Sequence, residues 1–285
     1  EIARFGGHIS PRSPFGRHVY VGANTFVPAI LRDNAAELQP NASAAELNAT
    51  IAAAREQLQE RSATIELVSA SHDGDRLTIR LRLQNLAGHK LPTGFPSRRA
   101  WVRVQVVDDE GQTVFASGAT NAMGQLVDSR GEVLASEAAG GPIQPHRDLI
   151  NRDDQVLILE DVMADVNGRP TFTLLRAATH LKDNRLLPKG WNPNHPDAEH
   201  TGVYGEAATD GSFVDGADTI TYELVAPEAE GPYRIRAAFL YQTLSPRFAA
   251  ELFTYSTSEV EAFKRYYAPS GSPPETMAAL EIPFD

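Results

Sequence analysis

The strongest signal along the chain is the alternation of apolar and polar residues. Apolar side chains occupy every second position of residues 77–84, between Thr, Arg and Gln. This period of two is typical of a strand with one buried face. Residues 102–106 repeat the pattern, and Asp-Glu-Gly at 109–111 predicts a turn into a partner strand at 113–116. Further strands are predicted at 155–160, 171–176, 219–225 and 234–241.

Helical signals lie toward the two ends of the chain. Ser43 and Glu46 form a capping-box pattern. The apolar residues at 47, 51, 54 and 58 share one face of the helix that follows, which should end near Arg61. Other helices are predicted from Thr25 to about Leu38, from Ser245 to about Tyr255, and from a second capping box at Ser258 toward Tyr267.

Strands separated by polar turns, with few helices, predict a mainly β fold. The expected architecture is an antiparallel β-sandwich, immunoglobulin-like, with an N-terminal arm and helices and short C-terminal helices. Residues 1–62 would form the arm and helical segment, and residues 63–285 the sandwich domain with its long loops. Two irregular stretches, 118–152 and 182–218, are long enough to be functional or to pack on a partner.

Composition narrows the classes of partner. The chain has 285 residues, of which 42% are apolar, so it can bury a sizeable core. Its formal net charge of −11 argues against nucleic acid, because phosphates repel an acidic surface. No apolar run approaches the roughly 20 residues that span a bilayer, so no membrane insertion is expected. Residues 1–15 read like the interior of a longer protein, which favours a removed leader or a fragment.

The sequence contains no cysteine. This excludes disulfides, thiol catalysis and thiolate metal sites in the chain, and also thioether-linked haem, which requires Cys-x-x-Cys-His. The sequence also lacks Gly-x-Ser-x-Gly, a phosphate-binding glycine loop and His-Glu-x-x-His. The chain therefore does not read as a self-sufficient enzyme, although an enzymatic role stays open.

Residues 1–24, rich in Gly, Pro, Arg and His, predict an irregular arm that lies on another surface. Within the arm, His18 precedes Val-Tyr-Val-Gly-Ala-Asn, and His8 follows two glycines. A neutral imidazole on such an arm can reach an open position on a haem iron, so His18 and His8 are candidate axial ligands. The alternative is a pair of surface histidines. The isolated histidines at 72, 89, 146 and 180 are expected in core or surface roles.

The most distinctive run is GHKLPTGFPSRRAW at 88–101, which connects two predicted strands. Its glycines and prolines fix the path of the connection. Arg98 and Arg99 are candidates for holding a carboxylate, including a haem propionate, in bidentate fashion. The alternative, preferred for at least one of them, is an ion pair with an acidic residue of the same domain. Trp101 is expected to pack rather than to carry electrons.

Two weaker patterns raise the question of other metals. Residues 210–218 combine aspartates and glycines in one loop, a candidate calcium site whose spacing differs from the EF-hand. Solvated turn carboxylates are the alternative. His195 and His200 enclose Asp197 and Glu199, and a mononuclear transition-metal site of a hydrolase is conceivable there. The proline after His195 opposes a rigid helical spacing.

Residues 85–108, with the 88–101 run at their centre, resemble the C-terminal region of a family of bacterial multihaem c-type cytochromes. Weaker matches follow in the same order along the chain, so the resemblance extends over nearly its whole length. They comprise residues 18–24, 155–161, 181–188, 241–242 and 263–267.

The resemblance implies a haem-free, β-rich domain that follows haem-bearing segments in an exported protein. Because this chain has no haem-attachment site, haem c would be carried by another segment or another chain. His18 matches the arm histidine of the family, which implies an axial-ligand role. A periplasmic or cell-surface location follows from the same analogy.

Three functions remain open at this point. The first is an accessory or scaffold domain of a multihaem electron-transfer system, which docks or caps haem through residues 1–24, with a multihaem cytochrome segment or subunit as its partner. The second is a structural or adhesive cell-surface module without a redox role. The third is a metal-dependent enzyme built on His195 and His200.

Overall fold

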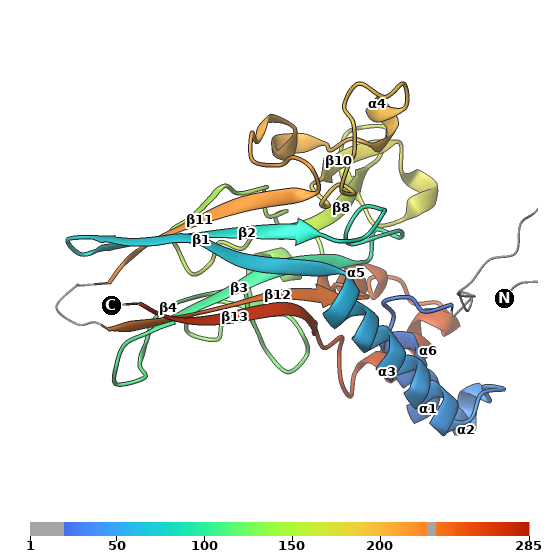
Figure 1. The fold of residues 1–285 in the computed structure, drawn as a ribbon. Coiled ribbons are helices and arrows are strands. Elements are labelled where there is room, and N and C mark those ends of the chain that lie inside the picture. Colours follow the sequence, from blue (N-terminus) through green and yellow to red (C-terminus); the bar gives the residue numbers. More distant parts are fainter. Residues whose placement is uncertain (1–19, 227–231, 285) are drawn as a thin grey trace, which may run out of the picture.

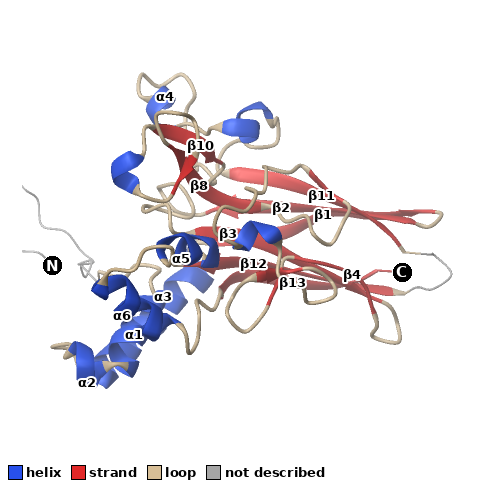
Figure 2. Cartoon of the chain, turned by 180° about the vertical axis from the view of Figure 1, so that it is seen from behind, coloured by secondary structure: helices blue, strands red, loops and turns tan. Residues whose placement is uncertain are grey.

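Two facing β-sheets form the body of the protein, and helices gather at one end of them (Figures 1 and 2). The computed structural model describes residues 20–226 and 232–284. In spatial order, the first sheet consists of β1 (Ala63–Asp73), β2 (Arg76–Asn85), β11 (Ala217–Val225) and β7 (Leu149–Ile150). The second consists of β10 (Thr179–Asp183), β8 (Ile158–Ala164), β3 (Arg99–Val107), β12 (Tyr233–Gln242) and β13 (Glu275–Phe284).

Shorter strands extend the second sheet, and one further pair forms a separate two-stranded sheet. β4 (Thr113–Ser117) pairs with β3, β9 (Pro170–Thr171) pairs with β8, and β5 (Ala119–Thr120) pairs with β6 (Leu126–Val127). The α-helices are α1 (Phe26–Asp33), α2 (Ala35–Leu38), α3 (Ala44–Arg61), α4 (Ala198–Thr201), α5 (Pro246–Leu252) and α6 (Ser258–Tyr267). The 3₁₀ turns are η1 (Ala135–Glu137), η2 (Leu174–Arg176) and η3 (Gly205–Thr209).

The predicted mainly β, sandwich-like fold is confirmed. Within the described residues the strand pairs are antiparallel, apart from the short parallel pairing of β7 with β11. The alternating apolar residues of β2 and β3 lie in one core between the sheets, which explains the period of two in the sequence. Fully buried members of this core include Leu77, Ile79, Leu81, Leu83, Val102, Val104 and Val106.

Trp101 points to the opposite face of β3 and packs with Leu126 and Leu240 in a second, smaller cluster. Its indole Nε1–H donates to the carbonyl of Gly118 at 2.9 Å. Gly118 has a φ of +76°, and a Cβ there would clash with the carbonyl oxygen of Val102. Only glycine fits this position. The turn after β4 and the position of the indole ring therefore depend on each other.

The helical predictions are confirmed with two corrections. At the start of α3, Ser43 Oγ accepts from the N–H of Glu46, and the N–H of Ser43 donates back to that glutamate. The helix predicted to run to Leu38 is instead divided into α1 and α2 at Asn34. The cap of α6 is Thr257 rather than the following serine.

The alternation pattern missed the two long edge strands β1 and β13 and misassigned one loop. β1 and β13 are partly exposed along most of their length and therefore lack a regular apolar period. Of residues 171–176, only Thr171 is in a strand, and Leu174–Arg176 form the turn η2 instead. Leu175 at its centre is fully exposed, so its apolar character does not report a strand face.

None of the helices in the described residues is both long and apolar enough to cross a lipid bilayer. This matches the sequence, whose longest regular helix, α3, carries charged residues along its exposed face.

We expect Leu81→Ala to lower the free energy of unfolding by about 2–5 kcal/mol, because it would leave a cavity between the two sheets. Val225→Ala on the adjacent strand β11, where the side chain is 70% exposed, should change it by less than about 0.5 kcal/mol. Urea unfolding monitored by circular dichroism measures both values. Equal effects would contradict the assignment of the buried face.

Candidate functional site

Three segments that carry the sequence resemblance meet at one end of the second sheet. Two backbone hydrogen bonds of 2.9 Å join the 88–101 run to residues 181–188. The fully buried side chain of Asn184 accepts from the backbone N–H of Glu160 at 2.9 Å. This bond joins residues 155–161 to residues 181–188. Segments far apart in the sequence are therefore neighbours in space.

At this junction lies a group of charged side chains, the His180 cluster, formed by Lys90, Asp161, His180, Asp183 and Arg185. Asp183 is fully buried and accepts two hydrogen bonds of 2.7 Å from Arg185 and one of 2.6 Å from Lys90. Arg185 also lies 3.5 Å from a carboxylate oxygen of Asp161. The pairing neutralises charges that would be costly to bury alone.

The pKa values of the two carboxyl groups in the cluster are shifted in opposite directions. Burial disfavours the charged form of both. For Asp183, hydrogen bonds and charge from Arg185 and Lys90 outweigh burial and lower its pKa below the ordinary value. For Asp161, burial is the larger effect and raises the pKa, although His180 and Arg185 partly offset it.

His180 is paired through one ring nitrogen and is partly exposed. Its Nδ1 lies 2.7 Å from Oδ1 of Asp161, and its ring stacks on Tyr204 with centroids 4.7 Å apart. Because the carboxylate accepts this bond, Nδ1 carries a proton, so in the neutral ring the lone pair is on Nε2. Nε2 forms no hydrogen bond within the described part of the chain. A carboxylate-oriented imidazole of this kind suits a metal ligand or a general base.

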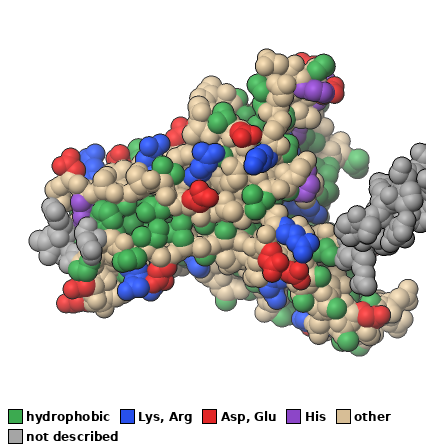
Figure 3. Space-filling model, viewed as in Figure 1, with side chains coloured by type: hydrophobic (Ala, Val, Ile, Leu, Met, Phe, Trp, Pro, Cys, Tyr) green, Lys and Arg blue, Asp and Glu red, His purple; other side chains and the backbone are tan. Residues whose placement is uncertain are grey.

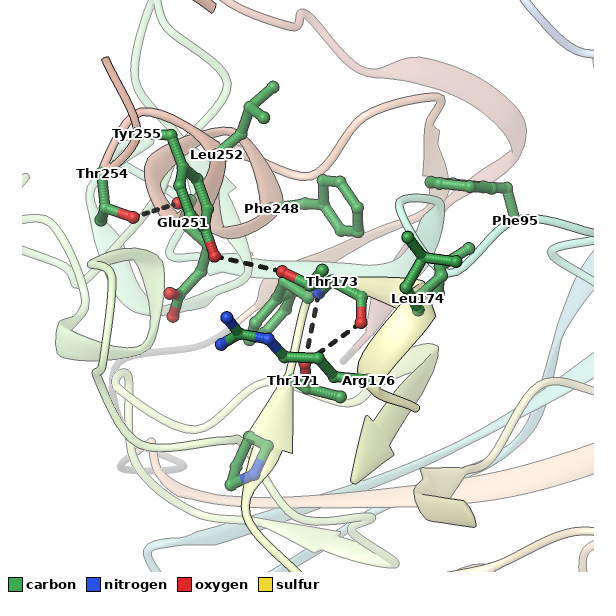
Figure 4. A pocket seen from close by; sticks show the side chains of 13 residues that line it. Phe95, Thr171, Thr173, Leu174, Arg176, Phe248, Glu251, Leu252, Thr254 and Tyr255 are labelled. Carbon is green, nitrogen blue, oxygen red and sulfur yellow. Dashed lines mark hydrogen bonds between the residues drawn. The ribbon is translucent and has the colours of Figure 1, made fainter. Parts of the chain in front are cut away.

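An apolar groove of about 620 Å³ lies close to the cluster (Figure 4). Phe248 lines the groove and makes edge-to-face contacts with Phe95 and Phe172, with ring centroids 5.6 and 5.8 Å apart. Leu175 and Arg176 of η2 line one wall. A groove of this volume, with aromatic walls and one guanidinium, is within the size range of ligand sites.

The groove and the His180 ring open on the same face of the second sheet. The groove residue Thr171 and the cluster residue His180 both pair with Met163 of β8, from its two sides. Directly paired residues of neighbouring strands project their side chains to the same face. The ring and the groove can therefore contact one and the same partner.

Figure 3 shows a second apolar area, which lies between β1 and β13. Partly buried residues of these edge strands contribute to it, namely Leu67, Ala70, Ala278 and Leu280, and Val68 is half exposed. The joint between the two sheets is thus open to solvent along this side.

A second polar group, the Asp210 cluster, consists of His146, Asp148, Asp210, Ser212 and Asp218. Asp210 accepts from the backbone N–H of Ser212 at 2.7 Å and faces Nε2 of His146 at 3.1 Å. The hydroxyl of Ser212 lies 3.2 Å from Asp210 and 3.1 Å from Asp218. Asp148 is 3.5 Å from the same imidazole nitrogen.

Asn184 fixes the protonation of His146. Its Oδ1 accepts from Glu160, so its Nδ2 is the donor to the carbonyl of Ile158 and to Nδ1 of His146. Because Nδ1 accepts, the ring proton lies on Nε2 and is donated to Asp210. His146 is thus a neutral hydrogen-bond donor in this cluster.

Asp218 is the least satisfied member of the Asp210 cluster. It is 1% exposed, and its Oδ2 is buried without a hydrogen-bond donor. Burial first, and then the nearby charge of Asp210, raise the pKa of Asp218 to about 8. At neutral pH its carboxyl group therefore holds a proton unless another cation replaces it.

The residues that the sequence predicts to contact haem are not members of the His180 cluster or the Asp210 cluster. His8 and His18 lie outside the described residues. Arg98 is half-buried and donates to the carbonyl of Thr93 at 3.0 Å. Arg99 is buried elsewhere, in the network described next.

Arg99 forms the internal ion pair that the sequence offered as the alternative for one of the two arginines. Its guanidinium donates to both carboxylate oxygens of Glu137, at 2.6 and 3.0 Å, and to Gln242 at 2.7 Å. It also lies over the ring of Trp101. Because it is only 2% exposed, this guanidinium stabilises the fold and does not reach a propionate.

His195 and His200 lie on an exposed loop around α4, with side chains 63% and 74% exposed. Within the described residues, neither belongs to a group of three or more potential metal ligands. In the 210–218 loop, the Ser212 hydroxyl lies 3.2 Å from Asp210 and 3.1 Å from Asp218, whereas Asp215 accepts from a backbone N–H. Among the residues that the structure describes, the aspartates of this loop do not form a group of three potential metal ligands, so the structure gives the calcium hypothesis no support.

Sequence reasoning missed the residues that the fold assembles. His146 and His180 were expected to be isolated, yet each has carboxylate neighbours supplied by distant segments. The one available signal was the run Asp183-Asn184-Arg185 inside the resemblance, because three consecutive polar residues next to apolar ones suggest buried pairing.

Comparisons with known proteins give a limited result. No protein-family model matches the sequence, and no curated protein matches it. Among solved structures, the penta-heme cytochrome c552 from Thermochromatium tepidum is similar at 18% sequence identity with a TM-score of 0.47. The match covers 81% of this chain and 41% of that chain. Similarity at this level assigns no ligand or partner to this protein.

We expect Asp183→Asn to lower the free energy of unfolding by about 3–5 kcal/mol, because Lys90 and Arg185 would lose their buried counter-charge. The control Asp154→Asn breaks an ion pair that is at least half exposed and should cost at most about 1 kcal/mol. Since the pKa of Asp183 is lowered, its contribution should disappear as the pH falls through that lowered value. Urea unfolding at several pH values would measure this; similar losses in both variants would contradict it.

The raised pKa of Asp218 predicts a pH dependence of opposite sign. Between the ordinary value of 3.8 and about 8, the folded state holds a proton that the unfolded chain releases. In metal-free buffer, stability should therefore fall with rising pH in this window, by up to about 1.4 kcal/mol per pH unit from this group. Asp218→Asn should flatten that slope in thermal unfolding. An unchanged slope would show that Asp218 is ionised in the folded state.

Proposed function

We propose that this chain is a haem-free accessory domain of an exported multihaem cytochrome system, which docks a haem held elsewhere. The chain has no cysteine and cannot attach haem c through thioether bonds. The haem would be carried by another chain or by another segment of the same protein. The periplasmic or cell-surface location is part of the proposal and rests on the resemblance of residues 85–108.

The observation that carries the proposal is the pairing of His180 with Asp161 through Nδ1, which leaves Nε2 without a hydrogen bond among the described residues. A neutral imidazole nitrogen is a good ligand of haem iron, and the carboxylate of Asp161 on the other nitrogen increases its basicity. Stacking on Tyr204 restricts the ring to one orientation. The side chain is 28% exposed, enough for Nε2 to reach an iron that approaches from outside.

The apolar groove near the His180 cluster also supports haem docking. Phe95, Phe172 and Phe248 offer an aromatic surface against which the edge of a macrocycle can pack. Arg176 lines the groove, and Arg98 follows Phe95 by three residues. Both guanidiniums are suited to propionate carboxylates.

A bound haem supplies the electron-transfer chemistry. The role of this chain would be to exclude water from the haem edge, which changes its reduction potential, and to fix its distance from the next centre. The N-terminal arm with His18 and His8 remains part of the proposal as a second point of attachment.

The test is a spectrophotometric titration of a haem c peptide that has one open axial position. Addition of the unaltered chain should shift the Soret band toward a low-spin, bis-nitrogen form. His180→Ala should weaken this response by about tenfold or more, as the loss of a metal ligand does. His200→Ala, which removes a 74% exposed imidazole, is the matched control and should behave like the unaltered chain.

His18→Ala should be titrated in parallel. A loss with His18→Ala alone would transfer the ligand role to the arm and overturn the assignment to His180. No Soret change with the unaltered chain would remove haem docking altogether and favour a structural or adhesive module.

A further inference from the structure

The outer face of the second sheet carries a group of arginines. On β3, β12 and β13, the residues that alternate with the core residues point away from the first sheet. Arg103 of β3 pairs with Ala238 of β12, which pairs in turn with Ala279 of β13. Arg236, two residues before Ala238, pairs with Glu281. Directly paired residues project to the same face, so these side chains share one surface.

A hollow with a volume of about 330 Å³ lies among these side chains. Ala238 and Ala279 leave it open, because their side chains are short, and Arg103, Arg236 and Glu281 line it. Arg103 and Arg236 are diagonal neighbours on adjacent strands, and such neighbours are about 7–8 Å apart, which long side chains can span. Both guanidiniums can therefore contact one ligand in the hollow.

The positive charge of this surface is only partly compensated. Arg236 and Arg234 share the carboxylate of Glu281, with N···O distances of 3.0 and 2.7 Å. The guanidinium of Arg103 is exposed and forms no ion pair or hydrogen bond with any residue that the structure describes. Three cations thus accompany one carboxylate, on a chain whose formal net charge is −11.

Two acidic residues lie near the same arginines without neutralising them. Asp108 and Asp109, in the turn after β3, line a neighbouring hollow together with Arg234 and Arg236. In the described part of the chain, neither aspartate forms an ion pair with these arginines. Arg103 does not line that second hollow. Its charge therefore remains available to a ligand from outside.

A carboxylate is the anion that suits this hollow. A guanidinium binds a carboxylate through two parallel hydrogen bonds. The carboxylate of Glu281, which also lines the hollow, would repel a doubly charged phosphate more strongly than a singly charged carboxylate. A nucleic acid would extend over the acidic surface around the arginines, whereas a short acidic segment would not.

We propose that the outer face of the second sheet docks an acidic segment of a partner protein, with one carboxylate held between Arg103 and Arg236. The net negative charge of the chain repels such a segment elsewhere and directs it to this face. Both arginines are exposed, so the contact is weak and falls with ionic strength. The surface does not include His180 and is independent of haem docking.

Fluorescence anisotropy of a labelled hexaglutamate peptide, titrated with the full chain at low ionic strength, tests the proposal. The unaltered chain should bind the peptide, and about 0.5 M salt should abolish the binding. Arg103→Gln should weaken it by about threefold to fivefold. The matched control is Arg80→Gln, which removes an exposed arginine from the outer side of the first sheet and should bind like the unaltered chain.

Two further variants separate docking in the hollow from general attraction. Ala279→Leu fills the hollow without a change of charge and should weaken binding; because this position is exposed on an edge strand, the variant should fold normally. Glu281→Gln removes the carboxylate that competes for Arg236 and should strengthen binding.

Three results would overturn the proposal. The first is no binding of hexaglutamate at low ionic strength. The second is an equal loss with Arg103→Gln and Arg80→Gln, which would show attraction without a defined site. The third is tighter binding of inorganic phosphate than of the peptide, which would make the hollow a site for small anions. None of these results bears on the haem titration, which depends on His180.

Discussion

The buried carboxylate of Asp183 is the interaction on which the rest of the candidate site depends. It receives Arg185 from its own segment and Lys90 from the distinctive run at 88–101. Without it, two cations would be buried with insufficient counter-charge, and the run would lose its link to β10. The charged network therefore fixes the position of the connection that also contributes Phe95 to the groove.

The residue after Asp183 extends this constraint to the other side of the chain. Asn184 is fully buried, holds the backbone of β8, and determines which nitrogen of His146 is protonated. Adjacent residues of an extended segment face opposite directions, so one dipeptide organises both polar clusters. A shift of this dipeptide would alter the His180 and Asp210 clusters together, so these buried polar residues have a structural role.

Much of the fold could be predicted from the sequence, because the apolar periods and capping patterns match the surroundings of those residues in the folded protein. β2 alternates because one face covers the core, and the cap at Ser43 is a local hydrogen-bond pattern. The edge strands were missed because exposure on both faces removes the period. For the site, only Arg98, Arg99 and the 210–218 loop were anticipated, and Arg99 proved to be structural. His180 and Asp161 could not be paired in advance, since their contact depends on the register of β10 with β8.

The open joint between β1 and β13 has a consequence for behaviour at high concentration. Unpaired strand edges are templates for intermolecular pairing, and in the described residues the edge strands β1 and β13 lie side by side (Figure 1). The bulge near Leu67 in β1 and Pro283 in β13 interrupt the row of backbone donors and acceptors, and Glu281 of β13 adds a charge at this edge. Such features oppose fibre-like self-association along the apolar area between β1 and β13.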